Sequence, residues 1–273
     1  MTYAKKSLGQ NFLRSQSALR AIVDTGKVKE GDVVLEIGPG RGALTEKLLE
    51  AGASVVAVEK DDALIPHLQE KFAKEIVCKK LFLIHGDILD LSAKEIFRTS
   101  NILSDLDVGR PSRNYKLVAN IPYYITGAVI RKFLGEGNPP LMMVLLLQKE
   151  VAERIVARDG KESILSIAVR AYCNPRYAMK VKREAFTPAP NVDSAIVAFE
   201  DISKKFFTEN KISEEKFFAL VKAGFAHKRK KLGGNLKSLS KKLNKECLEK
   251  IKDKRAEELS LEDWKVVICN SCK

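Results

Sequence analysis

Short apolar runs alternate with amphipathic segments between residues 16 and 150 of the chain. The last run, Leu141–Leu147, is continuously apolar, as a parallel strand covered on both faces should be. Strands that alternate with helices predict an α/β fold with a doubly wound sheet. The predicted strands are Asp32–Ile37, Ser54–Val58, Leu81–Ile84, Lys116–Ala119 and Leu141–Leu147.

Helical patterns and cap residues fill the intervals between these strands. Ser15 is placed to cap a helix that buries Leu19, Ile22 and Val23, and Asp61 or Asp62 to cap one that buries Leu64 and Leu68. Further helices are predicted at Ala43–Glu50, Lys149–Arg158 and Ser163–Cys173. Two late runs, Tyr177–Val181 and Ala195–Phe199, predict an antiparallel completion of the sheet. Extended or loop structure is predicted for residues 5–14, Thr99–Asn114 and Tyr124–Gly127.

The composition changes near Asp201, which predicts two domains, residues 1–200 and 201–273. The chain has 273 residues and a net charge of +13, and residues 201–273 hold 19 basic and 11 acidic side chains. Residues 216–245 contain ten basic residues and no acidic one, in two predicted helices, one with Phe217 and Val221 and one with Leu236 and Leu243. Such a tail suits a polyanion, nucleic acid first and an anionic membrane second.

Within this tail, Lys228-Arg229-Lys230-Lys231 is the densest basic cluster, and we expect it to bind RNA phosphates. A solvated face at the end of a helix, where cations suit the dipole, is the alternative for part of it.

Several classes of protein are disfavoured by the sequence. Its longest apolar run is too short to span a bilayer, and its N-terminus has no apolar signal region. Five irregularly spaced cysteines favour reduced thiols and a cytoplasmic protein. Cys269 and Cys272 form a single CxxC, for which unliganded thiols are favoured over a zinc site, so no metal is expected.

The segment Asn120-Ile121-Pro122-Tyr123 follows the fourth predicted strand, where an open α/β sheet places its chemistry. Asn120 offers an acceptor oxygen and a donor amide. Pro122 stiffens the turn and favours an extended Ile121, whose carbonyl can point outward. Two acceptors beside the ring of Tyr123 suit a planar base that carries an exocyclic amine. An ordinary turn after a strand is the alternative.

A glycine loop and two acids follow the first three predicted strands. Gly38-Pro-Gly-Arg-Gly42 has the spacing G-x-G-x-G, which differs from the G-x-G-x-x-G of dinucleotide-binding proteins. Glu59 lies 21 residues after Gly38, where an acid binds ribose hydroxyls, and Asp87 is placed to accept from an adenine amine. Helix N-capping is the alternative for each acid.

These motifs resemble the S-adenosylmethionine-dependent methyltransferases that act on adenine amines. Three further motifs, Gln10–Leu13, Leu147–Val151 and Phe186–Ser194, resemble the KsgA-type ribosomal RNA adenine dimethyltransferases over residues 7–200. The resemblance implies a Rossmann-like class I methyltransferase fold, a small C-terminal helical domain and dimethylation of two adjacent adenosines near the 3′ end of small-subunit ribosomal RNA. It also implies a cytoplasmic monomer that binds the assembling 30S particle.

The resemblance also assigns roles to single residues. Asn11 and Leu13 would close over the cofactor, with Gly38 and Gly40 beneath it. Glu59 would hold its ribose and Asp87 its adenine. Asn120 would bridge the cofactor and the target, and Phe186 would cover the base opposite Tyr123.

Three other functions compete with this interpretation. Erm-type enzymes, which modify large-subunit RNA, share the glycine, N-I-P-Y and F-x-P motifs. Methylation of a protein glutamine uses a similar Asn-Pro-Pro-Tyr turn. A non-catalytic assembly or transcription factor on the same fold is the third.

Overall fold

The described residues of the chain form two compact units. The computed structural model describes residues 5, 8–100, 115–135, 137–239 and 243–268. The first unit comprises Met1–Ala152 and Arg176–Ile202, and the second Glu153–Pro175 and Ser203–Lys273. The second unit thus includes a segment before residue 200 that no change in composition marks.

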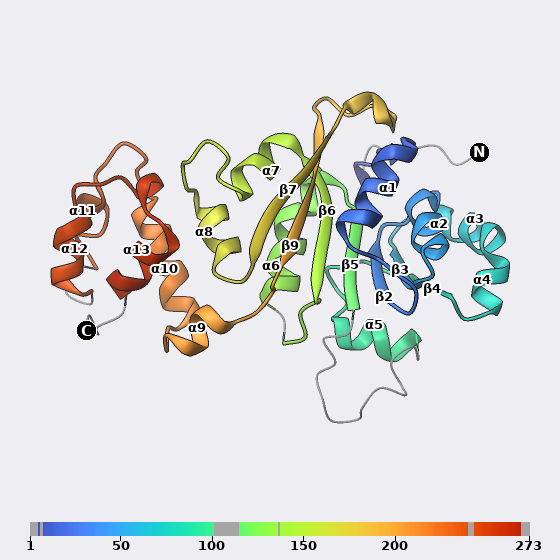
Figure 1. Ribbon diagram of the computed structural model, residues 1–273, viewed down its shortest axis with the longest axis horizontal. Coiled ribbons are helices and arrows are strands. Elements are labelled where there is room, and N and C mark those ends of the chain that lie inside the picture. The colour runs from blue at the N-terminus through green and yellow to red at the C-terminus, as the bar shows by residue number, and fades with distance from the viewer. Residues whose placement is uncertain (1–4, 6–7, 101–114, 136, 240–242, 269–273) are drawn as a thin grey trace. The chain divides into compact units, whose positions relative to one another are not determined.

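A seven-stranded sheet forms the centre of the first unit, in the order β4-β3-β2-β5-β6-β9-β7 (Figure 1). The strands from β4 to β6 pair in parallel, and β9 pairs antiparallel with β6. The predicted parallel sheet and its antiparallel completion are confirmed. The strands are β2 (Val33–Ile37), β3 (Ser54–Glu59), β4 (Leu81–His85), β5 (Tyr115–Asn120), β6 (Met142–Gln148), β7 (Asn174–Val181) and β9 (Ser194–Glu200).

Both faces of this sheet are buried. Alternate strand residues such as Val34 and Val55 belong to one apolar cluster with residues of α1, α2 and α3, and the intervening Leu35 and Val56 are also buried. Ser15 caps α1 by accepting from the Ala18 N–H, as predicted. The helices of this unit are α1 (Gln16–Thr25), α2 (Ala43–Glu50), α3 (Ile65–Lys71), α4 (Ala73–Val77), α5 (Ala93–Ser100), α6 (Thr126–Gly135) and the first part of α7 (Lys149–Ile155), whose last three residues belong to the second unit.

Two helices of the first unit, α5 and α6, overlap stretches that were predicted to be loops. The first, α5, extends into the predicted loop, and its Phe97 ring lies 4.6 Å from the ring of Tyr115. The rest of that loop, residues 101–114, lies outside the described residues. The predicted loop Tyr124–Gly127 is also wrong, because Tyr123–Ile125 forms the 3₁₀ turn η3 and Thr126 begins α6. Val129, Ile130 and Phe133 drive this helix by packing into the core.

The second unit is helical and has its own aromatic core. Phe217 is fully buried among the rings of Phe206, Phe207 and Phe218. The predicted helix with Leu236 and Leu243 is not present at residues 236–239, because α11 ends at Asn235 after two consecutive glycines; residues 240–242 lie outside the described part of the chain. The helices are α8 (Ile164–Arg170), α9 (Lys205–Glu209), α10 (Glu214–Gly224), α11 (Leu232–Asn235), α12 (Lys245–Ile251) and α13 (Leu261–Ile268).

The cysteines depart from the sequence-based prediction at one position. Cys78 and Cys173 form no disulfide, but Cys247 is disulfide-bonded, so the expectation of reduced thiols throughout is wrong there. The Cys269–Cys272 motif lies outside the described residues. Among the residues that are described, no cluster of His, Cys, Asp and Glu could hold a metal ion, and no helix is long and apolar enough to cross a membrane.

Gly42, the N-cap of α2, is the described glycine of the first unit whose replacement should cost the most stability. Its φ is +78°, and an added Cβ would lie 2.4 Å from Cε2 of the buried Phe72. We expect Gly42→Ala to lower the free energy of unfolding by about 2–5 kcal/mol, because backbone strain and overpacking add.

The matched control is Gly31→Ala, where φ is +84° but an added Cβ meets nothing within 4 Å. We expect it to cost only the backbone term, about 1–2 kcal/mol. Urea unfolding of both variants measures the difference, and equal losses of stability would contradict the packing argument.

Candidate active site

A cavity of about 370 Å³ lies at the carboxyl ends of β2, β3, β4 and β5. Segments that are far apart in the sequence line it, including residues 8–14, the glycine loop and the turn after β5. Ten of the predicted cofactor and catalytic residues line this cavity: Asn11, Leu13, Gly38, Gly40, Glu59, Asp87, Asn120, Ile121, Pro122 and Tyr123. The predicted positions therefore converge on one site, with Phe186 as the exception.

Glu59 holds the glycine loop from the end of β3. Its Oε2 accepts from the Gly40 N–H at 3.0 Å, and its Oε1 accepts from the Asp61 N–H at 2.8 Å. Burial raises the pKa of Glu59 above its ordinary value. The alternative of helix N-capping is wrong for Glu59, because Asp61 caps the following 3₁₀ turn, η2 (Asp62–Leu64). Glu59 instead ties the end of β3 to the loop that leaves β2.

Asp87 carries two interactions at the end of β4. Its Oδ1 accepts from the Leu89 N–H at 2.9 Å, and its Oδ2 pairs with Lys60 Nζ at 2.6 Å. Burial alone would raise the pKa of Asp87, but the bonds from Lys60 and Leu89 outweigh it and the pKa lies below its ordinary value. Asp87 is therefore an ionised acceptor at the wall of the cavity.

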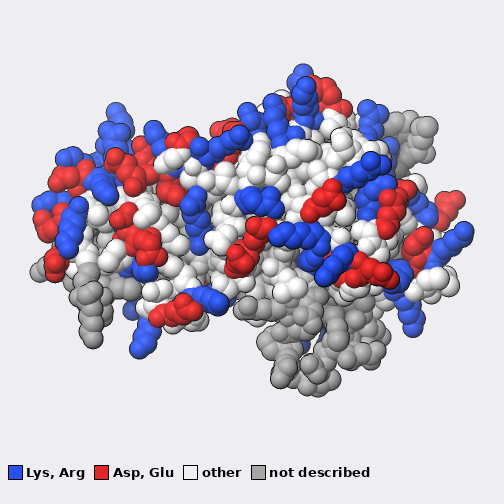
Figure 2. Space-filling view, in the orientation of Figure 1, with Lys and Arg blue, Asp and Glu red and all other residues white. Residues whose placement is uncertain are grey.

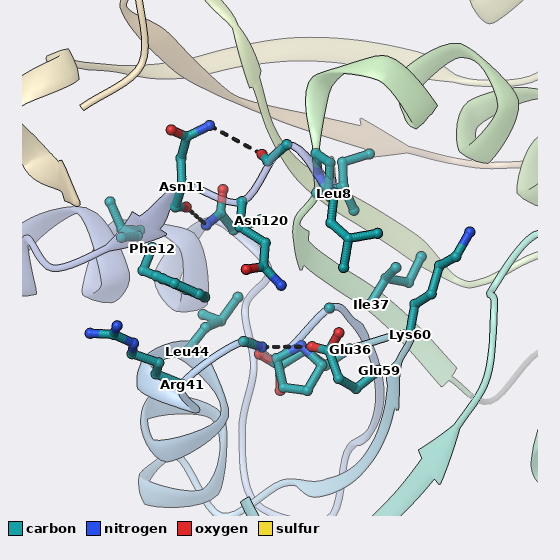
Figure 3. A pocket seen from close by; sticks show the side chains of 18 of the residues that line it. Leu8, Asn11, Phe12, Glu36, Ile37, Arg41, Leu44, Glu59, Lys60 and Asn120 are labelled. Atoms are coloured by element: carbon teal, nitrogen blue, oxygen red, sulfur yellow. Dashed lines mark hydrogen bonds between the residues drawn. The ribbon is translucent and has the colours of Figure 1, made fainter. Parts of the chain in front are cut away.

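The amide of Asn120 is oriented by the N-terminal segment. Its Nδ2 lies 3.2 Å from the backbone carbonyl oxygen of Asn11 (Figure 3). A carbonyl oxygen only accepts, so the NH₂ end of the amide must face Asn11 and Oδ1 must face the other way. Asn11 is itself held, because its side chain donates to the carbonyl of Gly9 at 3.2 Å. This arrangement leaves the acceptor of Asn120 for a ligand.

The N-terminal segment is anchored at both ends. Phe12 and Leu13 form β1 (Phe12–Leu13), which pairs antiparallel with β8 (Phe186–Thr187). Towards the N-terminus, the buried Asp61 accepts from Lys5 Nζ and from Gln10 Nε2, each at 2.6 Å. The segment therefore crosses the cavity from the acid end of β3 to the turn after β5.

Tyr123 lines the cavity, whereas Phe186 is buried in the apolar core. The hydroxyl of Tyr123 shares a hydrogen bond of 2.7 Å with Ser194, which fixes the tyrosine in the cavity wall. Phe186 is only 3% exposed and belongs to the apolar core, while its neighbour Thr187 lines the cavity. The exposed aromatic face expected at Phe186 is thus absent from the described structure, because pairing with Leu13 turns the ring inward.

Charged residues of the cavity wall that were not predicted from the sequence include Glu36 and Lys60, and the adjacent Asp61 was predicted only as a helix cap. Glu36 is buried in the cavity wall, accepts from Thr45 Oγ1 at 2.7 Å, and burial raises its pKa to about 8. The sequence signal for Glu36 is that an acid interrupts the apolar run Val33–Ile37. Lys60 and Asp61 directly follow Glu59, and only their partners in three dimensions reveal their roles.

The comparisons with known proteins agree with this geometry. The family model "Ribosomal RNA adenine dimethylase" matches residues 1–269. "Ribosomal RNA small subunit methyltransferase A" of Dehalococcoides mccartyi (strain ATCC BAA-2266 / KCTC 15142 / 195) is 42% identical over 272 residues, which are 97% of this chain and 87% of that protein.

Two crystal structures share the fold. A dimethyladenosine transferase from Plasmodium falciparum has a TM-score of 0.75 at 26% identity, over 93% of this chain and 95% of the other. The 23S rRNA methyltransferase ErmE has a TM-score of 0.71 at 22% identity, over 93% of this chain and 96% of the other. The predicted methyltransferase fold is confirmed, and the chain belongs to the ribosomal RNA adenine dimethylase family.

Proposed function

We propose that this protein uses S-adenosylmethionine to dimethylate the exocyclic amines of two adjacent adenosines in the 3′-terminal hairpin loop of small-subunit ribosomal RNA. The observation that carries the proposal is the amide of Asn120, which Asn11 orients in an acid-lined cavity. Family membership and the name of the Dehalococcoides relative support the same reaction and substrate. The protein would act as a cytoplasmic monomer on the assembling small subunit.

The residues present fit S-adenosylmethionine. A Cβ built on Gly38 would meet no atom within 4 Å, so the backbone there is open to a ligand. Each oxygen of Glu59 has a second lone pair, which would accept from a ribose hydroxyl, and Asp87 would accept from the adenine amine. Asn11 and Leu13 would cover the cofactor, and Gly40 would lie beneath it. A cavity of about 370 Å³ lies in the size range of small-molecule sites.

The turn after β5 would activate the target amine by position rather than by proton abstraction. The bound cofactor supplies a methyl group that its sulfonium already activates. Asn120 Oδ1 and the carbonyl oxygen of Ile121 would accept hydrogen bonds from the two N–H groups of the amine. These hydrogen bonds would favour a pyramidal nitrogen with its lone pair toward the methyl group. Pro122 holds this turn at φ −56° and ψ 135°. No base is needed before transfer, since the product ammonium is acidic.

The target base must leave its stack to reach this turn. The ring of Tyr123, fixed by Ser194, would offer one stacking face in return. The described position of Phe186 supports the β1–β8 pairing, and its contact with the base stays a prediction.

The substrate assignment is tested by mass spectrometry of both ribosomal RNAs from a strain that lacks the gene. We expect the loss of dimethyladenosine from two adjacent positions of the small-subunit RNA. Loss of dimethyladenosine from the large-subunit RNA instead would favour the Erm-type alternative. The chain also shares the fold of ErmE. Unchanged methylation of both RNAs would favour a non-catalytic factor.

The basic cluster Lys228–Lys231 lies in the exposed turn between α10 and α11. It begins four residues after α10 ends at Gly224, so the helix-dipole explanation is wrong. Lys231 also pairs with Asp253 at 2.8 Å. Basic and acidic side chains are interspersed on the face of the second unit seen in Figure 2.

Replacement of Lys228, Arg229, Lys230 and Lys231 by Gln should weaken RNA binding and flatten its salt dependence. The log–log slope should fall by roughly 0.7–0.9 for each RNA phosphate that the variant no longer binds, and Lys231 should contribute least because it is already paired. The matched control replaces the exposed Lys29, Lys74, Lys79 and Lys80 of the first unit by Gln. Equal slopes for the two variants, measured by titration at several salt concentrations, would refute phosphate binding at this turn.

A further inference from the structure

Tyr124 is a large aromatic residue that the proposed mechanism does not use. It is 61% exposed, although it lines the same cavity as Asn120. It directly follows Tyr123 in the turn η3, and successive residues of a 3₁₀ turn point about 120° apart. The two adjacent rings therefore face different directions, Tyr123 toward Ser194 and Tyr124 toward solvent.

The ring of Tyr124 is supported along one edge by a close approach of the backbone. A Cβ built on Gly9 would lie 3.3 Å from Cδ1 and 3.4 Å from Cε1 of Tyr124, and 3.6 Å from Cβ of Pro122. Gly9 also has φ +60°, which side chains rarely adopt. A glycine at this position lets the N-terminal segment pass close to that edge, while the ring keeps most of its surface exposed.

An exposed, edge-supported aromatic ring beside a base-binding cavity is a surface for a second base. Stacking on aromatic side chains tolerates any base, because every base has a π-face. Because the two tyrosines are adjacent in the chain and their rings diverge, one base on Tyr123 and its neighbour on Tyr124 would be two consecutive nucleotides.

We propose that Tyr124 is a stacking platform for the adenosine adjacent to the one in the cavity. This inference rests on the proposed function, in which both adenosines of a pair are modified. While one adenine occupies the turn Asn120–Tyr123, its neighbour would rest on Tyr124 outside. The platform would favour a purine at the neighbouring position and would hold the RNA between the modifications of the two nucleotides.

The experiment measures steady-state methylation of small ribosomal subunits that lack dimethyladenosine, together with S-adenosylmethionine binding by calorimetry. Tyr124→Ala should raise KM for the particles by about tenfold or more, with kcat and cofactor affinity close to wild type. Tyr124→Phe, which keeps the ring, should match the wild type. Tyr124→Leu keeps apolar bulk without a planar face and should match Tyr124→Ala. Val77→Ala, which shortens a side chain that is 81% exposed and outside the cavity, is the control.

A second substrate tests the base itself. Particles that carry uridine in place of the adjacent adenosine should be poorer substrates for the wild type, because a pyrimidine offers less surface for stacking. Tyr124→Ala should show no such preference.

The outcomes separate this inference from the proposed function. A wild-type protein that does not methylate small subunits would overturn both. An active wild type with an unchanged KM in Tyr124→Ala would overturn the platform alone. Weaker cofactor binding by Tyr124→Ala would also overturn it, because the ring would then belong to the cofactor site. Equal impairment of Tyr124→Phe would do so too, because the hydroxyl and not the ring would be responsible.

Discussion

Asn120→Ala is expected to slow methyl transfer by roughly 100-fold or more while RNA affinity hardly changes. The Oδ1 of Asn120 would accept from the amine most strongly in the transition state, when the nitrogen becomes pyramidal. An interaction of that kind acts on turnover rather than on binding. Single-turnover assays on small ribosomal subunits, read by mass spectrometry, measure the rate.

The variant Asn120→Asp tests the acceptor oxygen of the amide separately from its NH₂ donor. A carboxylate still accepts, but it cannot donate to the Asn11 carbonyl, which now lies 3.2 Å from Nδ2. We expect its rate to fall between those of the wild type and of Asn120→Ala, because an acceptor is present but no longer held. Wild-type turnover of Asn120→Ala would mean that this turn is not the active site.

The matched control is Asn210→Ala. The Asn210 side chain also donates to a backbone carbonyl, that of Phe206 at 2.7 Å, but it lies in the helical unit and outside the cavity. Its removal should leave the rate of methyl transfer unchanged.

The strands and their functional ends could be predicted because the signal is local. A buried parallel strand is a continuous apolar run, and the polar residue that follows the run marks the carboxyl end of the strand. Glu59, Asp87 and Asn120 lie at or just after three such strand ends. Because these ends are on the same side of a parallel sheet, identifying each strand separately was sufficient to predict that the three residues lie in one site.

The misses have physical causes of a different kind. The bond between Asn120 and Asn11 spans 109 positions, and the bonds of Asp61 to Lys5 and Gln10 span 56 and 51. No local pattern encodes contacts of such separation. Phe186 shows a different limit, since the resemblance implied a ring over the target base, whereas a two-residue strand paired with β1 buries the ring.

Glu59→Ala is expected to weaken S-adenosylmethionine binding by about 10- to 150-fold, the equivalent of about 1.5–3 kcal/mol for one charge-assisted hydrogen bond. The structure gives a reason why Glu59→Gln should bind S-adenosylmethionine almost as weakly as Glu59→Ala. The two carboxylate oxygens accept from the N–H groups of Gly40 and Asp61, at 3.0 and 2.8 Å. An amide has one acceptor oxygen, so its NH₂ end would face one of these donors and release that part of the loop.

Calorimetric titration of Glu59→Ala, Glu59→Gln and Asp87→Ala with S-adenosylmethionine measures these effects, with thermal unfolding to show that each variant is folded. Asp87→Ala should also bind weakly, through loss of the acceptor for the adenine amine. The control is Glu50→Ala, which removes an exposed acid of α2 that pairs only with Lys47 among the described residues and does not line the cavity. Wild-type affinity in both Glu59→Ala and Asp87→Ala would place the cofactor elsewhere. Wild-type affinity in Glu59→Gln alone would show that Glu59 binds the ribose without needing to hold both backbone donors.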